Sequence, residues 1–174
     1  MKTTYISTRL NRYTFEVDQV RYWVESRCKG KTLNLFAGKV KLKLDEYRVD
    51  LNEDMLADEY CDAYEFIEKC DTFYDTILLD PPYAYRKAME MYEGRYTTKF
   101  KKIADLIHEK NLTKRVISFG YHSAFMGRGR LFDLEELCVF GHGGSQHCTI
   151  AIVEEKLVDG QQYKDTIFAA RENQ

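Results

Sequence analysis

The sequence has little proline, no excess of charge and no long apolar run. Its 174 residues include two prolines, and 26 basic side chains against 28 acidic ones give a net charge of −2. This balance argues against a simple basic nucleic-acid-binding module. No run is apolar for long enough to cross a bilayer, and residues 1–17 lack the apolar core of a secretory signal peptide. We therefore expect a cytoplasmic protein of one domain that does not act on membranes.

Cysteine is present in a pattern that excludes its commonest structural uses. The five cysteines include no CxxC pair, and their number is odd. Both observations argue against a disulfide framework and against a zinc site, so we expect no metal. Small buried thiols in a reducing compartment are the simplest interpretation.

Charge is unevenly distributed along the chain. Residues 45–75 contain twelve acids and two bases, whereas residues 84–130 contain eleven bases and four acids. Solvated helix faces are one explanation of this asymmetry. The alternative is that the basic segment meets a polyanion while the acidic segment faces away from it.

Strand and helix patterns alternate along the sequence, which predicts an α/β fold. Val17, Val20 and Val24 recur near helical spacing, and residues 74–80 form the clearest strand. A hairpin over 134–155 would make the final strand antiparallel in a mostly parallel sheet. The expected elements are strands at 32–36, 46–51, 56–62 (weak), 74–80 and 115–121, helices at 17–28, 63–70 and 100–107, a turn and helix start at 37–44, and a flexible basic loop at 124–130.

Candidate ligand-binding residues fall at the carboxyl ends of the expected strands, where open α/β sheets bind their ligands. Gly38 follows the first of these strands and allows a close turn. Its surroundings match neither GxGxxG nor a phosphate loop, which disfavours a triphosphate ligand. Asp50 and Asp62 end the next two strands, where a carboxylate can accept hydrogen bonds from ribose hydroxyls. Each acid could instead cap a helix or a turn, and Gly38 could be a purely structural turn.

The two prolines stand together in the stretch Asp80-Pro81-Pro82-Tyr83, just after an apolar run. Proline fixes φ and has no N–H, so the backbone here is stiff and poor in donors. The Asp80 carboxylate and a proline carbonyl would form a preorganised pair of acceptors for the two N–H groups of a planar amine, and Tyr83 could stack on the ring that carries it. This arrangement would aim the amine nitrogen at an electrophile, and orientation is a large part of catalysis. The alternative is an ordinary Pro-Pro turn.

These features together resemble the class I S-adenosylmethionine-dependent methyltransferases of the amino type, which have a Rossmann-like fold. The resemblance spans residues 13–154 of a single domain over 1–174. It rests on LNLFAGK, LLDPPYAYRK, ISFGYHSAFMGRGR and GHGGSQHCTIAIVE, which are similar to short archaeal and viral DPPY methylases. It implies S-adenosyl-L-methionine as the cofactor and a grip on the target amine by Asp80, Pro81, Pro82 and Tyr83. The residues that it implies for cofactor binding are Tyr13, Phe15, Phe36, Ala37, Gly38, Asp50, Asp62, Ala63 and Asp80.

The sequence departs from this family at two places. Lys39 and Val40 replace the usual residue and second glycine of the first motif, and Asn34 stands where an acid is common. We expect cofactor contacts to differ there, although the turn itself depends mostly on Gly38.

The resemblance implies methylation of an exocyclic amine of a nucleobase, with adenine N6 in DNA as the first hypothesis. The alternatives are an RNA base, at adenine N6 or guanine N2, and a cofactor-binding subunit that needs a partner for activity. No insertion is long enough for a separate target-recognition domain, so a partner protein or a homodimer could supply specificity. Among the histidines, His142 is the best candidate for a function. The expected contacts to nucleic acid are Arg86, Lys87, Arg128 and Arg130.

Overall fold

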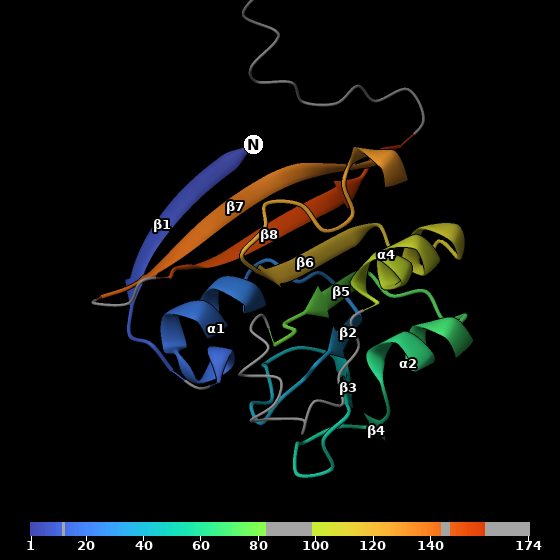
Figure 1. Cartoon of the computed structure of the whole chain (residues 1–174), viewed down its shortest axis with the longest axis horizontal. Helices are drawn as coiled ribbons and strands as arrows, with labels where there is room; N and C mark the ends of the chain where they lie inside the picture. The colour runs from blue at the N-terminus through green and yellow to red at the C-terminus, as the bar shows by residue number, and fades with distance from the viewer. Residues whose placement is uncertain (12, 83–98, 144–146, 159–174) are drawn as a thin grey trace, which may run out of the picture.

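The computed structural model describes residues 1–11, 13–82, 99–143 and 147–158, and its core is an eight-stranded sheet (Figure 1). The strand order is β1-β7-β8-β6-β5-β2-β3-β4. All neighbouring strands are parallel except the two pairs that include β8. This confirms the expected α/β sheet with an antiparallel final strand. The strands are β1 (Lys2–Thr8), β2 (Thr32–Leu35), β3 (Glu46–Asp50), β4 (Glu59–Tyr60), β5 (Thr76–Leu79), β6 (Arg115–Gly120), β7 (Phe132–His142) and β8 (Thr149–Lys156).

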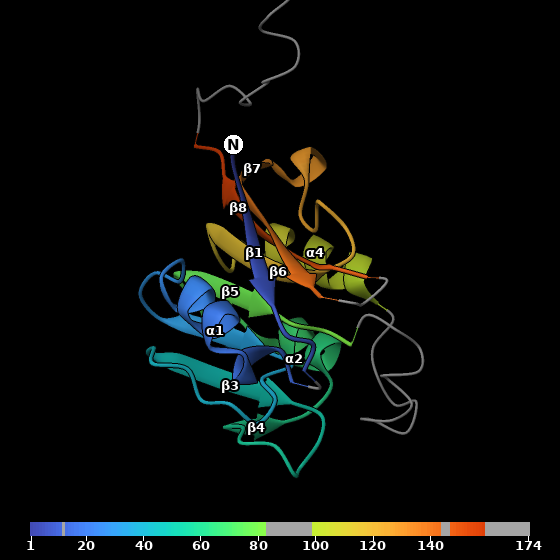
Figure 2. The same ribbon diagram turned by 90° about the vertical axis from the view of Figure 1, so that its left-hand side faces the viewer.

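Helices cover both faces of the sheet. α1 (Asp18–Glu25) lies on one face, and α2 (Ala63–Lys69) and α4 (Phe100–Glu109) lie on the other (Figures 1 and 2). Two short 3-10 turns, η1 (Thr14–Glu16) and η2 (Arg128–Arg130), precede α1 and β7. Among the described residues, no helix combines the length and the apolarity needed to span a bilayer.

Successive side chains of the central strands point to opposite faces of the sheet and belong to two separate apolar cores. Ile77 and Leu79 of β5 belong to the core under α2 and α4, whereas Leu78 between them belongs to the core under α1. β6 alternates in the same way, with Val116 on the α4 side and Ile117 on the α1 side. Strands buried on both faces give the continuous apolar runs by which the sequence predicted them.

β1 is an edge strand that the sequence patterns did not predict. It pairs in parallel with β7 through residues 2–8, and four of its seven residues are exposed. Tyr5 is 68% exposed, and its ring lies over Gly141, where an added Cβ would come within 2.0 Å of the hydroxyl oxygen. A half-exposed strand rich in threonine has no apolar run for pattern analysis to detect.

The segment between β2 and β3 differs most from expectation. The sequence predicted a turn and a helix start at 37–44, but residues 37–45 contain no helix, so this prediction was wrong. Parallel neighbours usually require a helical crossover. Here side chains of β3 hold the connecting loop instead, as described with the site below. The weak strand expected at 56–62 is reduced to the two residues of β4.

The loop at 124–130, expected to be flexible, is held by a buried acid of β8. Glu154 is 1% exposed and accepts the backbone N–H groups of Phe125, Met126 and Gly127 at 3.0, 2.9 and 2.8 Å. Gly127 has a φ of 68°, which lets the chain turn so that its N–H joins this set. The loop therefore has a defined shape, and the sequence pattern missed the distant carboxylate that gives it.

Glu136 of β7 joins the edge of the sheet to α1. Its carboxylate accepts hydrogen bonds from Arg27 at 2.9 and 3.2 Å and from the Trp23 indole at 3.4 Å. Lys2 of β1 lies 3.5 Å from the same carboxylate. One buried acid thus connects β1, β7 and the end of α1.

We expect Glu136→Gln to lower the free energy of unfolding by about 2 kcal/mol near neutral pH, because a charged hydrogen bond to Arg27 is lost. Burial alone would raise the pKa of Glu136, but the hydrogen bond and charge of Arg27 outweigh it and lower the pKa. A lowered pKa gives stability above the unfolded pKa that disappears as pH falls through the folded value.

The difference in stability between wild type and variant should therefore shrink from about pH 6 to about pH 3, as measured by urea denaturation. The exposed Glu53→Gln is the control and should change little. A difference that stays constant across this range would contradict the assigned role of the ionised carboxylate.

Candidate functional site

The sheet register brings the predicted site residues to one edge. Leu35 of β2 pairs with Val49 of β3 and with Leu79 of β5. The residues that follow, Phe36, Asp50 and Asp80, therefore emerge side by side at the carboxyl ends of three adjacent strands. This is the edge where open parallel sheets bind ligands.

The turn after β2 is built on left-handed backbone and on Asp50. Phe36 has a φ of 63° and Gly38 a φ of 64°. The Asp50 carboxylate accepts the N–H of Gly38 at 2.8 Å and that of Asn52 at 2.9 Å. A Cβ placed on Gly38 would meet no atom within 4 Å, so the turn opens onto free space. Gly38 thus leaves open space at the sheet edge.

The Asp50 side chain is almost completely buried. It is 2% exposed, and burial raises the pKa of its carboxyl, although the N–H groups of Asn52 and Gly38 oppose this. Each carboxylate oxygen can accept more than one hydrogen bond. Asp50 therefore holds the turn in the described structure.

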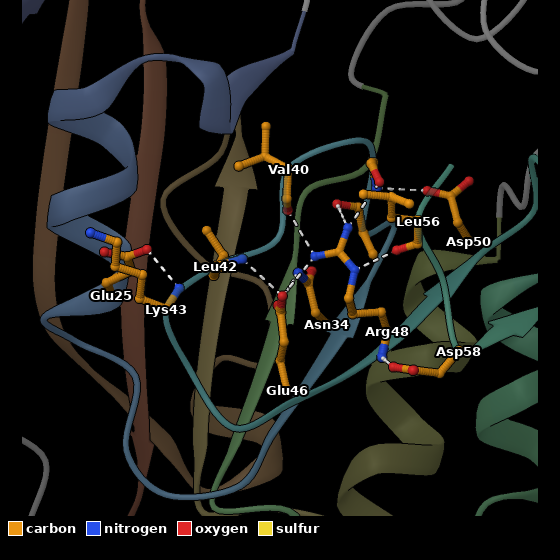
Figure 3. Close-up of polar contacts among 12 residues, drawn as sticks. Glu25, Asn34, Val40, Leu42, Lys43, Glu46, Arg48, Asp50, Leu56 and Asp58 are labelled. Carbon is orange, nitrogen blue, oxygen red and sulfur yellow. Dashed lines mark hydrogen bonds and ion pairs between the residues drawn. The ribbon is translucent and has the colours of Figure 1, made fainter. Parts of the chain in front are cut away.

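Arg48 of β3 holds the loop that replaces the crossover helix (Figure 3). Its guanidinium donates to the carbonyl oxygens of Val40 at 2.7 Å, Gly38 at 2.9 Å and Ala37 at 3.1 Å, and also to that of Leu56. The side chain is 4% exposed. One buried cation thus satisfies carbonyl groups that a helix would have paired internally.

Glu46 balances this cation and holds the same loop. It lies 2.7 Å from Arg48 and also accepts the N–H of Leu42 and the amide of Asn34, each at 2.9 Å (Figure 3). The Asn34 amide oxygen is buried and has no hydrogen-bond partner within the described ranges. Asn34 of β2 thus donates to a buried carboxylate of the neighbouring strand.

Asp62 and Ala63 follow β4. The Asp62 side chain accepts the N–H of Tyr64 at 2.9 Å and so caps α2, which confirms the capping alternative. Asp62 is half-buried and Ala63 is 4% exposed. Capping uses one oxygen of Asp62, so the residue remains accessible at the sheet edge.

The N-terminal segment approaches the Gly38 turn through Tyr13. The ammonium of Lys39, next to Gly38, lies 5.1 Å from the centroid of the Tyr13 ring. Phe15 instead points into the core, where its ring packs edge-on against Phe119 at 5.4 Å. Tyr13 therefore lies near the Gly38 turn through Lys39, whereas Phe15 is a buried core residue rather than a residue of the turn.

Asp80 lies directly across from Phe36. Its N–H donates to the Leu35 carbonyl at 3.4 Å, and the residue is half-buried. Pro81 is buried and Pro82 half-buried, and both line a cavity of about 640 Å³ on the α4 side. Tyr83, Arg86 and Lys87 lie outside the described residues.

The two arginines of the 124–130 loop have different environments. Arg130 donates two hydrogen bonds to Asp105 of α4, at 2.7 and 2.9 Å, and a third to the Met126 carbonyl at 2.7 Å. These contacts lower the pKa of Asp105. Arg128 is half-exposed and lies 4.0 Å from Asp133. Arg130 therefore joins the loop to α4, and Arg128 is the more accessible cation.

His142 joins three strands at the same edge. Its two ring nitrogens each lie 3.0 Å from a hydroxyl, one of Thr8 on β1 and one of Thr149 on β8. His147 lies with its ring 5.7 Å from that of Tyr121. No group of three or more side chains suited to a metal occurs in the part of the chain that the structure describes.

Three residues that organise the site were missed at the level of sequence: Glu46, Arg48 and Glu154. A detectable signal existed, because Glu46 and Arg48 stand two apart and therefore on the same face of a strand whose neighbours are buried. Opposite charges in that arrangement indicate a buried ion pair. Glu154 also interrupts an apolar strand, but nothing local indicates which loop it binds.

We expect Arg48→Met to lower the free energy of unfolding by about 3 kcal/mol, because Glu46 would remain buried without its counter-charge. The double variant Glu46→Gln with Arg48→Met should recover part of this loss, as measured by chemical denaturation. Arg21→Met, whose partner Asp18 is exposed, is the control and should cost little. An unchanged unfolding midpoint for Arg48→Met would show that the loop does not depend on this cluster.

Comparisons with known proteins identify a shared fold. No protein-family model matches the chain, and no curated protein matches it by sequence. TrmN from Thermus thermophilus matches 80% of this chain with a TM-score of 0.53 at 21% identity, and this chain spans about half (48%) of TrmN. HI0767 from Haemophilus influenzae, described as a methylase, matches 81% of this chain and 88% of its own, with a TM-score of 0.51 at 13% identity. The yhhF protein from Escherichia coli, described as a methyltransferase, matches 80% of this chain and 82% of its own, with a TM-score of 0.52 at 10% identity.

At these identities the likeness establishes the fold. The strand order and the single antiparallel strand agree with it. The chain has the Rossmann-like fold of the class I methyltransferases.

Proposed function

We propose that this chain is an S-adenosylmethionine-dependent methyltransferase that acts on an exocyclic amine of a nucleobase, with adenine N6 in DNA as the first candidate. The observation that carries the proposal is the register of β2 and β5, which brings Asp80 next to the end of β2, where the open turn of Gly38 begins. The proposed pair of acceptors, the Asp80 carboxylate and the Pro81 carbonyl, would thereby lie next to the proposed cofactor turn. That adjacency is what transfer between two bound partners requires.

The residues around the Gly38 turn suit S-adenosyl-L-methionine. The open Gly38 turn would receive its methionine part, and Asp50 and Asp62 would accept hydrogen bonds from ribose and adenine. Tyr13, whose ring lies 5.1 Å from the ammonium of Lys39, would pack beside the cofactor. Phe36, Ala37 and Ala63 would contribute backbone and apolar contacts. When bound, this cofactor supplies an electrophilic methyl group.

The chain's own part in the reaction would be to orient the amine. The Asp80 carboxylate would accept one N–H, and the Pro81 carbonyl would accept the other. Proline has no N–H that could compete for these acceptors. The proton that the amine releases after attack could pass to the Asp80 carboxylate. Tyr83 would stack on the base, and Arg86, Lys87 and Arg128 would contact phosphates.

RNA is the second candidate substrate, with adenine N6 or guanine N2 as the target. Between the Gly38 turn and Asp80 the described chain contains only β3, β4 and α2, which leaves no space for a target-recognition domain. A structured RNA presents unpaired bases without such a domain. A partner protein or a second copy of the chain could supply the same selectivity on DNA, and a subunit active only with its partner is the remaining alternative.

Asp80→Ala should reduce methyl transfer by at least about a hundredfold, because a preorganised acceptor at the reacting amine is lost. The affinity for S-adenosylmethionine should change little, since the Gly38 turn is untouched. Transfer of labelled methyl groups and calorimetric titration of the cofactor measure the two effects separately. Asp71→Ala, which removes an exposed carboxylate, should behave as wild type. Loss of cofactor affinity in Asp80→Ala would show that the carboxylate serves the cofactor rather than the amine.

The methylated nucleoside tests the proposed substrate directly. After incubation with duplex DNA, single-stranded DNA or total RNA, mass spectrometry of the digested polymer should detect N6-methyladenosine in its deoxy form. Methyl label in RNA alone would contradict DNA as the substrate and support the second candidate, an RNA base. Tight cofactor binding with no label in any polymer would favour the partner-dependent subunit.

A further inference from the structure

The cavity of about 640 Å³ lies on the α4 face of the sheet, beyond the two prolines. Its lining includes Pro81, Pro82, Phe100, Ser118 and Phe125. The polar side chains in its lining are Lys101, Ser118, Tyr121, His122 and Arg130. Flat apolar surfaces with a few polar groups suit a planar ring that carries hydrogen-bonding atoms on its edge.

Ser118 provides an unpartnered hydroxyl in the lining of this cavity. It is 2% exposed, and its oxygen has no hydrogen-bond partner within the described residues. On β6 its side chain lies on the same face as Val116, toward α4, because Ile117 and Phe119 belong to the opposite core. An unpaired buried hydroxyl destabilises a fold and therefore requires an explanation. A ligand that accepts or donates one hydrogen bond would provide it.

The loop that borders the cavity is held in place. Glu154 binds the N–H groups of Phe125, Met126 and Gly127, and Arg130 binds Asp105 of α4. The loop at 121–131 is thus fastened to both β8 and α4. The cavity is therefore formed before any ligand enters, which reduces the ordering cost of binding.

The cavity lies at a different position from the proposed binding site of the reacting base. A base that presents its amine to Asp80 must face the Gly38 turn, on the β2 side. The cavity lies on the other side of the prolines and includes Ser118 of β6, whose register partner is Leu79. A strand with one base at Asp80 would bring its next nucleotide to this side. Lys101, 86% exposed and among the lining residues, could meet the phosphate between the two nucleotides.

We propose that the cavity binds the nucleobase adjacent to the methylated one, and that Ser118 hydrogen-bonds its edge. This inference rests on the proposed function, since it requires a nucleic-acid substrate. It assigns sequence selectivity to the methyltransferase domain itself, through a preformed pocket that needs no added domain.

The test uses short single-stranded oligonucleotides, in DNA and RNA versions, with all four bases at each position flanking one target base. Wild type should prefer one base at one flanking position by about tenfold in kcat/KM, the size of one buried hydrogen bond. Ser118→Ala should abolish that preference and leave the target base and the affinity for S-adenosylmethionine unchanged. Ser118→Thr keeps the hydroxyl and should retain the preference. Ser123→Ala, in the exposed part of the same loop, is the matched control.

The unfolding temperature and the affinity for oligonucleotides complete the test. Ser118→Ala should unfold at the same temperature as wild type or higher, because it removes an unsatisfied buried group. Absence of a flanking preference in wild type, or an equal rate loss on all contexts in Ser118→Ala, would overturn the inference. If no methyl transfer occurs, fluorescence anisotropy with the same oligonucleotides still measures the preference. A binding preference that Ser118→Ala removes would then support the pocket while the proposed reaction fails, and no such preference would overturn the pocket as well.

Discussion

The shape of the loop after β2 depends on the hydrogen bonds that the buried guanidinium of Arg48 donates to it. The guanidinium binds the carbonyl oxygens of Ala37, Gly38 and Val40, so the loop after β2 keeps its shape without a helix. Glu46 neutralises the charge and binds the same loop through Leu42. A buried charge is stable only when it is paired and fully hydrogen-bonded, and this cluster meets both conditions. The open turn at Gly38 is a consequence of this arrangement.

Buried acids repeat this solution elsewhere in the molecule. Glu154 gathers three successive N–H groups of the loop beside the α4-side cavity, and Glu136 connects β1 and β7 to α1. In each case a carboxylate on a strand satisfies groups in a segment that has no regular structure of its own. Such contacts fix geometry more strongly than apolar packing alone, because hydrogen bonds to a charged group are directional and strong. The edge of the sheet that carries the proposed site is thereby preorganised.

The site combines two surfaces on either side of the same short stretch. Toward β2, the Asp80 N–H donates to the Leu35 carbonyl, next to the turn of Gly38. Toward β6, the prolines and Ser118 line the cavity under the 121–131 loop. The sheet register places both surfaces within one or two residues of the end of β5, since Leu79 pairs with Leu35 on one side and Ser118 on the other. A strand of nucleic acid crossing this point would meet chemistry and selectivity together.

The sequence by itself determined the fold class, the strands β2, β3, β5 and β6, the final hairpin, and the grouping of Phe36, Asp50 and Asp80 at one edge. These follow from local periodicity and from the rule that parallel strands end together. Only the tertiary structure decided that residues 37–45 form no helix, that β1 completes the sheet and that Phe15 is a core residue. It also left the Ser118 hydroxyl without a hydrogen-bond partner among the described residues. These outcomes depend on side chains from other elements, such as Arg48 of β3 for residues 37–40 and Phe119 of β6 for Phe15. Local patterns carry no information about which group of another element will contact or satisfy a buried atom.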